Sequence, residues 1–148
     1  MTGSKQAEIP EAARVLLDQN SLGIMTTIRH NDGRLSSNPV GYVWTGEALG
    51  VSTLKNRMKY KNLVANPMIT FCVVSQKDLT SYVEIRGKAT LEDDTDRSFL
   101  RRQFIRQSGG QEPPDDLDAP DAERVTIWIH PEQVSTPVLY GGRFAQPE

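Results

Sequence analysis

Cysteine and histidine are scarce in this 148-residue sequence, which has one cysteine and two histidines. One cysteine cannot form a disulfide within the chain, and His30 and His130 stand apart from other candidate ligands, which argues against a zinc site. No apolar run approaches the roughly 18 residues of a membrane-spanning helix, and the polar segment 1–8 does not resemble a signal peptide. We therefore expect a cytoplasmic protein with no metal site and no membrane contact.

An excess of positive charge is also lacking, since 17 lysines and arginines stand against 19 acidic residues, for a net charge of -2 and a pI near 5.7. This balance argues against a general nucleic-acid partner. The chain is long enough for one hydrophobic core, so we expect a single domain over residues 1–148 with irregular tails at 1–9 and 135–148. Cys72 lies in the apolar stretch 71–74, which predicts a buried, unreactive thiol.

Six segments have the residue pattern of β-strands. They are 22–29, 35–44, 48–53, 68–74, 82–92 and 125–129. Short turns between them exclude parallel crossovers, so the sequence predicts a mainly β protein, a six-stranded antiparallel barrel with a few peripheral helices. In the first strand the predicted apolar face consists of Leu22, Ile24 and Ile28. Strand 68–74 is apolar throughout and is predicted to be central and buried on both faces.

Three helices and one long loop are predicted between or beside these strands. The helices cover 10–19, 56–66 and 93–107, the last capped by Asp93 or Asp94. Segment 108–121 is rich in glycine, proline and acidic residues and is predicted to be a mobile loop, either disordered or acting as a lid. Pro39 cannot donate a ladder hydrogen bond, which predicts an edge strand or a bulge around it.

The helix predicted at 56–66 begins with unfavourable charges. Asn56 is a suitable N-cap, but Arg57 and Lys59 occupy the first turn and Lys55 comes just before them. The helix dipole favours acidic residues there by about 0.3 to 1 kcal/mol each. The predicted apolar stripe of this helix consists of Tyr60, Leu63 and Val64. Free backbone N–H groups together with cations are typical of a phosphate site, and the alternative is a set of surface cations that the fold tolerates.

Three groups of residues together resemble a known superfamily. They are strand 22–28 with the turn Asp32-Gly33-Arg34, the helix start Arg57 and Lys59 with Asn62-Leu63 and Asn66-Pro67, and segment 83–89. In this order and spacing they resemble the pyridoxamine 5'-phosphate oxidase-like split-barrel superfamily. The sequence is most similar to its flavin/deazaflavin oxidoreductase B group of actinobacteria, whose members use coenzyme F-420, an 8-hydroxy-5-deazaflavin. The resemblance covers about residues 13–91 and 125–129.

The resemblance implies an FMN-binding split barrel that works as a homodimer with two cofactor sites at the subunit interface. It assigns the cofactor phosphate to Arg57 and Lys59. Residues two apart on a helix project about 200° apart, so these two side chains can reach one anion only if Arg57 lies at the helix entrance. The other implied contacts are Ser52 and Thr53 to the phosphate and ribityl chain, and Asn38, Pro39 and Val40 to the ring. For Asn38 a turn or bulge role is the alternative. The set Lys55, Lys61 and Arg34 either meets an anionic cofactor tail or is solvated.

The same resemblance implies an F-420-dependent oxidoreductase that transfers a hydride from the reduced cofactor to a conjugated small-molecule acceptor, with no obligatory acid-base side chain. Two alternatives stay open: an FMN-dependent oxidase or reductase, and a protein that binds a flavin, deazaflavin or tetrapyrrole without turnover. Tyr82, Glu84 and Arg86 either line the partner's pocket or form a solvated strand face. The Arg-x-Val motif of the pyridoxamine phosphate oxidases is replaced by residues 38–40, and their C-terminal Arg and His pair is missing, so oxidation of vitamin B6 is not expected.

Overall fold

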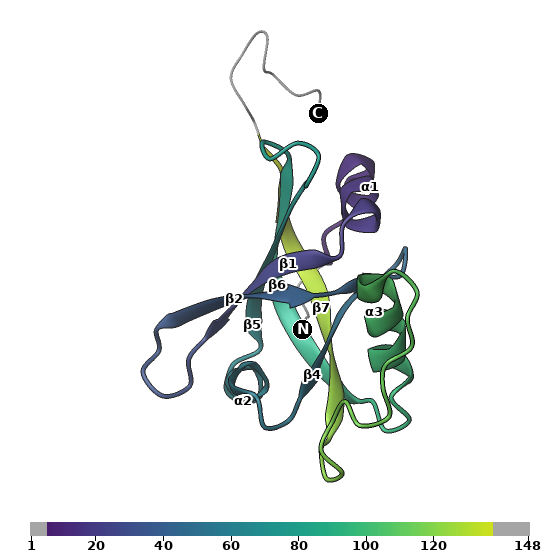
Figure 1. The fold of residues 1–148 in the computed structure, drawn as a ribbon. Coiled ribbons are helices and arrows are strands. Elements are labelled where there is room, and N and C mark those ends of the chain that lie inside the picture. Colours follow the sequence, from purple (N-terminus) through teal and green to yellow (C-terminus); the bar gives the residue numbers. More distant parts are fainter. Residues whose placement is uncertain (1–5, 138–148) are drawn as a thin grey trace, which may run out of the picture.

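The computed structural model describes residues 6–137, in which one antiparallel sheet forms a half-barrel with three helices beside it (Figure 1). The sheet order is β2-β1-β5-β6-β7-β4-β3. The strands are β1 (Leu22–Ile28), β2 (Leu35–Gly41), β3 (Val43–Trp44), β4 (Leu49–Leu54), β5 (Met68–Val74), β6 (Tyr82–Asp93) and β7 (Arg124–Ser135). The helices are α1 (Glu11–Gln19), α2 (Met58–Ala65) and α3 (Ser98–Ser108), and none of them is long and apolar enough to cross a membrane. The predicted antiparallel, mainly β class is confirmed.

The sheet has seven strands, and the predicted number of six is wrong because segment 35–44 is divided at Tyr42. The Tyr42 hydroxyl donates to the Leu17 carbonyl at 2.7 Å, and its backbone N–H donates to Ser21 at 3.1 Å. Before Tyr42 the chain pairs with β1, and after it with β4, so one segment supplies both edges of the sheet. Pro39 lies in the edge strand β2, as its missing N–H predicts.

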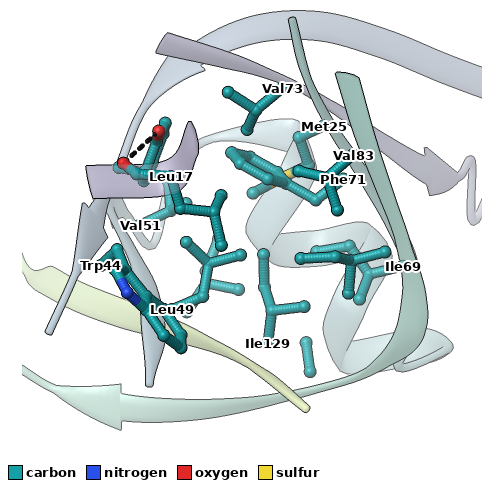
Figure 2. Packing of buried hydrophobic residues seen from close by; sticks show 14 of the residues in the cluster. Leu17, Met25, Trp44, Leu49, Val51, Ile69, Phe71, Val73, Val83 and Ile129 are labelled. Carbon is teal, nitrogen blue, oxygen red and sulfur yellow. Dashed lines mark hydrogen bonds between the residues drawn. The ribbon is translucent and has the colours of Figure 1, made fainter. Parts of the chain in front are cut away.

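The core lies on the inner face of the half-barrel (Figure 2). Along β6 the burial alternates as the sequence predicts, with Val83 and Ile85 completely buried. The predicted inward residues of α1 are also buried and add to this core; they are Ala13, Leu16 and Leu17. Strand alternation in β6 and the three-to-four spacing in α1 therefore identify the core face correctly.

The predicted core face of β1 is wrong. Leu22 and Ile24 are 48% and 40% exposed, whereas Met25 on the opposite face is fully buried. The cause is Gly23, where an added Cβ would lie 2.4 Å from the ring of Phe71. Gly23 faces inward and makes room for that ring, so Met25 and Thr27 share its inward face and the aliphatic residues Leu22 and Ile24 face outward.

Strand β5 is central in the sheet, as predicted, but it is not buried on both faces. Met68 and Val74 are 55% and 40% exposed, and Cys72 is half-buried on the same outward face, so its predicted full burial is wrong. Burial still raises the pKa of the Cys72 thiol, with Glu84 as a second cause. The outward side of β1 and β5 is therefore an apolar surface in the described chain.

Helix α2 begins at Met58 with Arg57 at the N-cap, so the predicted cap Asn56 is wrong by one residue. Leu63 is buried, but Val64 is 62% exposed and does not belong to an inward stripe as predicted. The residue next to Leu63 at the inward side of the helix is Asn62, which is 1% exposed, and Tyr60 is half-buried.

Helix α3 begins at Ser98 with Arg97 at the N-cap, so the predicted cap position at Asp93 or Asp94 is wrong, but the Asp94 side chain still contacts the helix start. Its carboxylate accepts the backbone N–H groups of Phe99 at 3.1 Å and Leu100 at 2.9 Å. The intervening residues form a turn, with Arg97 in the left-handed region at φ 61°. A carboxylate four residues before the helix start therefore satisfies two of its free N–H groups.

The long loop after α3 is attached at two points. Asp118 forms a two-point ion pair with Arg124, and Glu112 pairs with Arg101. The predicted mobility of this loop stays a prediction.

The final strand runs to Ser135, so both its predicted end at residue 129 and the predicted tail start at 135 are wrong. Tail residues 1–5 and 138–148 lie outside the described range.

Candidate functional site

The start of α2 presents cations and free backbone donors together. Arg57 has extended backbone angles, φ -83° and ψ 148°, and therefore lies at the helix entrance, the position it needs in order to converge with Lys59. The amides of Met58, Lys59 and Tyr60 belong to the first turn and have no acceptor within the helix. Within residues 6–137 neither the Arg57 nor the Lys59 side chain forms an ion pair or a hydrogen bond.

Electrostatics at this helix start favour an anion. Lys59 is half-buried, and burial together with the nearby Arg57 guanidinium lowers the pKa of Lys59. The two like charges lie next to each other at the positive end of a helix dipole and have no compensating carboxylate among the described residues. A phosphate would supply that missing negative charge and accept from both side chains and the free amides.

The strand before the helix is less available than predicted. Lys55 forms ion pairs with Asp93 at 3.0 Å and Glu123 at 3.4 Å, and the hydrogen bond to Asp93 is the main cause that raises the pKa of Lys55. The hydroxyl of Ser52 accepts from Arg124 at 3.3 Å on the outer face of the sheet. Thr53 is 5% exposed on the inner face. Ser52 and Thr53 therefore direct their side chains to opposite faces and do not converge on one ligand.

The residues predicted to contact the ring also divide between two faces. Asn38 is opposite Met25 in the register, so it lies on the inner face, while Pro39 is opposite Ile24 on the outer face. Val40 shares the inner face with Asn38, and both are half-buried. Asn38 and Val40 thus form one half-buried strip on β2, and Pro39 is separated from it.

Sequence reasoning missed a polar contact that joins α2 to β1. The Asn62 Oδ1 atom accepts the backbone N–H of His30 at 3.0 Å, and its Nδ2 atom donates to the Thr27 hydroxyl at 3.1 Å. Thr27 is 4% exposed and Asn62 is 1% exposed. The available signal was an asparagine at an inward position one turn after Lys59, where an aliphatic residue is usual.

Two other groups of predicted residues have structural partners or face solvent. Arg86 donates to the Glu84 carboxylate at 2.5 Å and to the Ser135 hydroxyl at 2.9 Å on the outer face of β6. Arg34 and Lys61 are exposed. Among residues 6–137 no group of three or more His, Cys, Asp or Glu side chains is placed to hold a metal ion.

The half-barrel with a cationic helix start after β4 defines the class of protein as a pyridoxamine 5'-phosphate oxidase-like split barrel. Residues 9–136 match the family described as pyridoxamine 5'-phosphate oxidase, and the chain belongs to this family.

Solved structures give the same classification. A protein named F420 reductase is 30% identical, with a TM-score of 0.73, and the match covers 86% of this chain and 98% of that one. A protein described as a putative pyridoxamine 5'-phosphate oxidase from Listeria innocua is 22% identical, with a TM-score of 0.62 and coverage of 82% and 92%, and shows the fold alone. A heme-binding protein from Mycobacterium smegmatis is 15% identical, with a TM-score of 0.57 and coverage of 88% and 59%, and shows the fold alone. No curated protein matches the sequence significantly.

Proposed function

We propose that this protein is a coenzyme F-420-dependent oxidoreductase. The observation that carries the proposal is the pair Arg57 and Lys59, which stands at a helix start with free amides and has no carboxylate partner among the described residues. A cofactor phosphate fits this arrangement in charge and in donor geometry. The 30% identity to a protein named F420 reductase, over nearly the full length of both chains, supports the deazaflavin as the cofactor.

The residues of this chain bind and orient the cofactor in the proposed function. Arg57, Lys59 and the first amides of α2 would hold the phosphate, and Asn38 and Val40 on the inner face of β2 would contact the ring. The cofactor supplies the hydride, which is transferred to a conjugated small-molecule acceptor. Lys55 is omitted from the proposed contacts because Asp93 and Glu123 already neutralise it.

The cofactor is tested by titrating the purified protein separately with oxidised coenzyme F-420 and with FMN, followed by tryptophan and cofactor fluorescence. The proposal expects binding of the deazaflavin that is at least tenfold tighter than binding of FMN. Tighter binding of FMN would move the protein to the flavin-dependent alternative. Binding of the deazaflavin with no oxidation of its reduced form by any acceptor tested would favour a carrier without turnover.

We also propose that the protein is a homodimer that uses the outward face of β1, β2 and β5. The exposed large aliphatic and methionine side chains on this face are Leu22, Ile24, Leu35, Met68 and Val74, with exposures from 40% to 72%. An apolar surface that continues across three adjacent strands is more than scattered exposure and is typical of an association surface. A second copy of the chain would bury it.

Introducing a charge on this face is expected to produce monomers. Ile24→Asp places a carboxylate between Pro39 and Cys72 in the middle of the surface, where a buried charge without a partner opposes association. Size-exclusion chromatography with light scattering measures the mass. Leu79→Asp is the matched control, because Leu79 is 76% exposed in the β5–β6 turn, outside the surface. A wild-type monomer, or a dimer that survives Ile24→Asp, contradicts the proposed surface.

A further inference from the structure

Asn62 is the most deeply buried polar side chain of α2, and both of its polar atoms form hydrogen bonds to β1 or to the turn after it. It accepts from the His30 backbone and donates to the Thr27 hydroxyl, so it bridges the end of β1 and the turn that follows. These partners lie 32 and 35 residues away in the sequence. A buried amide with both ends satisfied holds two elements in one relative position, because a shift leaves a polar group without a partner.

Apart from its short connections to β4 and β5, helix α2 has few attachments that could fix its position. It is 8 residues long, has no side-chain cap at its start, and buries only Asn62 and Leu63. Met58 and Val64 are 45% and 62% exposed. A single buried leucine gives apolar contact but no direction, whereas the two hydrogen bonds of Asn62 are directional. The two hydrogen bonds of Asn62 are therefore the directional side-chain contacts between α2 and the β1 end of the sheet.

Strand β1 in turn carries β2. Thr27 is opposite Ser36 in the antiparallel register, and Asn38 lies two residues further on the same face. The contact from Asn62 to Thr27 thus connects the helix that presents Arg57 and Lys59 with the strand that presents Asn38 and Val40. These are the two parts of the proposed cofactor site.

We infer that Asn62 is a positioning residue that sets the distance between the phosphate-binding start of α2 and the ring-side strip of β2. The inference rests on the proposed function, since it concerns the geometry of that site. A ligand that reaches both parts gains affinity from their fixed spacing, whereas a ligand that reaches one part does not. Removal of the Asn62 contact is therefore expected to weaken binding of the complete cofactor more than binding of either part alone.

The experiment compares three ligands: coenzyme F-420, its 8-hydroxy-5-deazaflavin chromophore without the phosphate tail, and inorganic phosphate. In Asn62→Ala and in Thr27→Val the complete cofactor is expected to bind about tenfold more weakly, with little change for either part. Thr27→Val removes only the hydroxyl that accepts the hydrogen bond from Asn62 Nδ2, so it tests the same contact from β1. Thr27→Ser keeps the hydroxyl and is expected to retain wild-type affinity.

Asn66→Ala is the matched control, because Asn66 ends the same helix and its side chain accepts from Met68, not from β1. Circular dichroism at the titration temperature confirms that each variant is folded. Equal losses for all three ligands, or no loss for the complete cofactor, would overturn the inference. If the wild type binds FMN and not coenzyme F-420, the proposed cofactor is wrong, and the inference about Asn62 is then tested with FMN, riboflavin and phosphate. A wild-type protein that binds neither cofactor overturns both the proposed function and the inference.

Discussion

Alanine at Arg57 or at Lys59 is expected to weaken cofactor binding about tenfold to a hundredfold without unfolding the protein. Each side chain would contribute a charge-assisted hydrogen bond to the phosphate, worth about 1.5 to 3 kcal/mol, and about 1.4 kcal/mol corresponds to a factor of ten. Neither side chain has a partner within the described residues, so its removal breaks no ion pair. Fluorescence titration of the wild type and both variants measures the affinity.

The stability of these variants gives a second, independent result. Because cations at a helix start oppose its dipole, Arg57→Ala and Lys59→Ala are expected to unfold at the same temperature as the wild type or slightly above it. Lys77→Ala, in the β5–β6 turn, controls for the loss of one positive charge elsewhere. Unchanged cofactor affinity in both variants would exclude a phosphate site at the start of α2.

The pH dependence of binding separates the two cations. The pKa of Lys59 is lowered by burial and by Arg57, so its charge is lost at lower pH than that of an ordinary lysine. Affinity for the cofactor is therefore expected to fall in the alkaline range. In Lys59→Arg the fall is expected to disappear, because a guanidinium stays charged.

Loss of the Asp118 carboxylate is expected to destabilise the fold by about 2 to 4 kcal/mol, because it leaves a largely buried guanidinium without its partner. Asp118 accepts from Arg124 Nε at 2.8 Å and from Nη2 at 2.7 Å, and the two side chains are 3% and 13% exposed. The pair attaches the long loop to the start of β7. Chemical denaturation of Asp118→Ala measures the change in the free energy of unfolding.

The stabilisation by Asp118 depends on pH in a defined direction. The Arg124 guanidinium lowers the pKa of Asp118 below its ordinary value of 3.8. A carboxyl whose pKa is lower in the folded than in the unfolded state stabilises the fold. This stabilisation is fully present above the unfolded-state pKa and is lost as the pH falls through the folded-state pKa. The difference between wild type and Asp118→Ala is therefore expected to be largest near neutral pH and to shrink in acid. Asp116→Ala, an exposed acid of the same loop, is the control and is expected to change little.

Residue patterns that depend on local chemistry were predicted well from the sequence. The alternation in β6 identifies its buried face, and the sequence correctly places Arg57 and Lys59 at the start of a helix, while the anion site there stays a prediction. Both signals come from residues within a few positions of one another. Failures occur where a distant group decides the outcome, as at β1, where the Phe71 ring reverses the buried face.

The same distinction divides the candidate site. By itself the sequence determined the antiparallel β class, the Arg57 and Lys59 pair and the apolar segments of the core, because alternation, capping and helix dipoles act over short distances along the chain. Only the tertiary structure decided that Tyr42 divides one predicted strand into two, that Asp93 and Glu123 neutralise Lys55, and that Asn62 joins α2 to β1. These contacts connect residues some 25 to 70 positions apart, and packing and burial in the folded chain select such partners rather than any local preference.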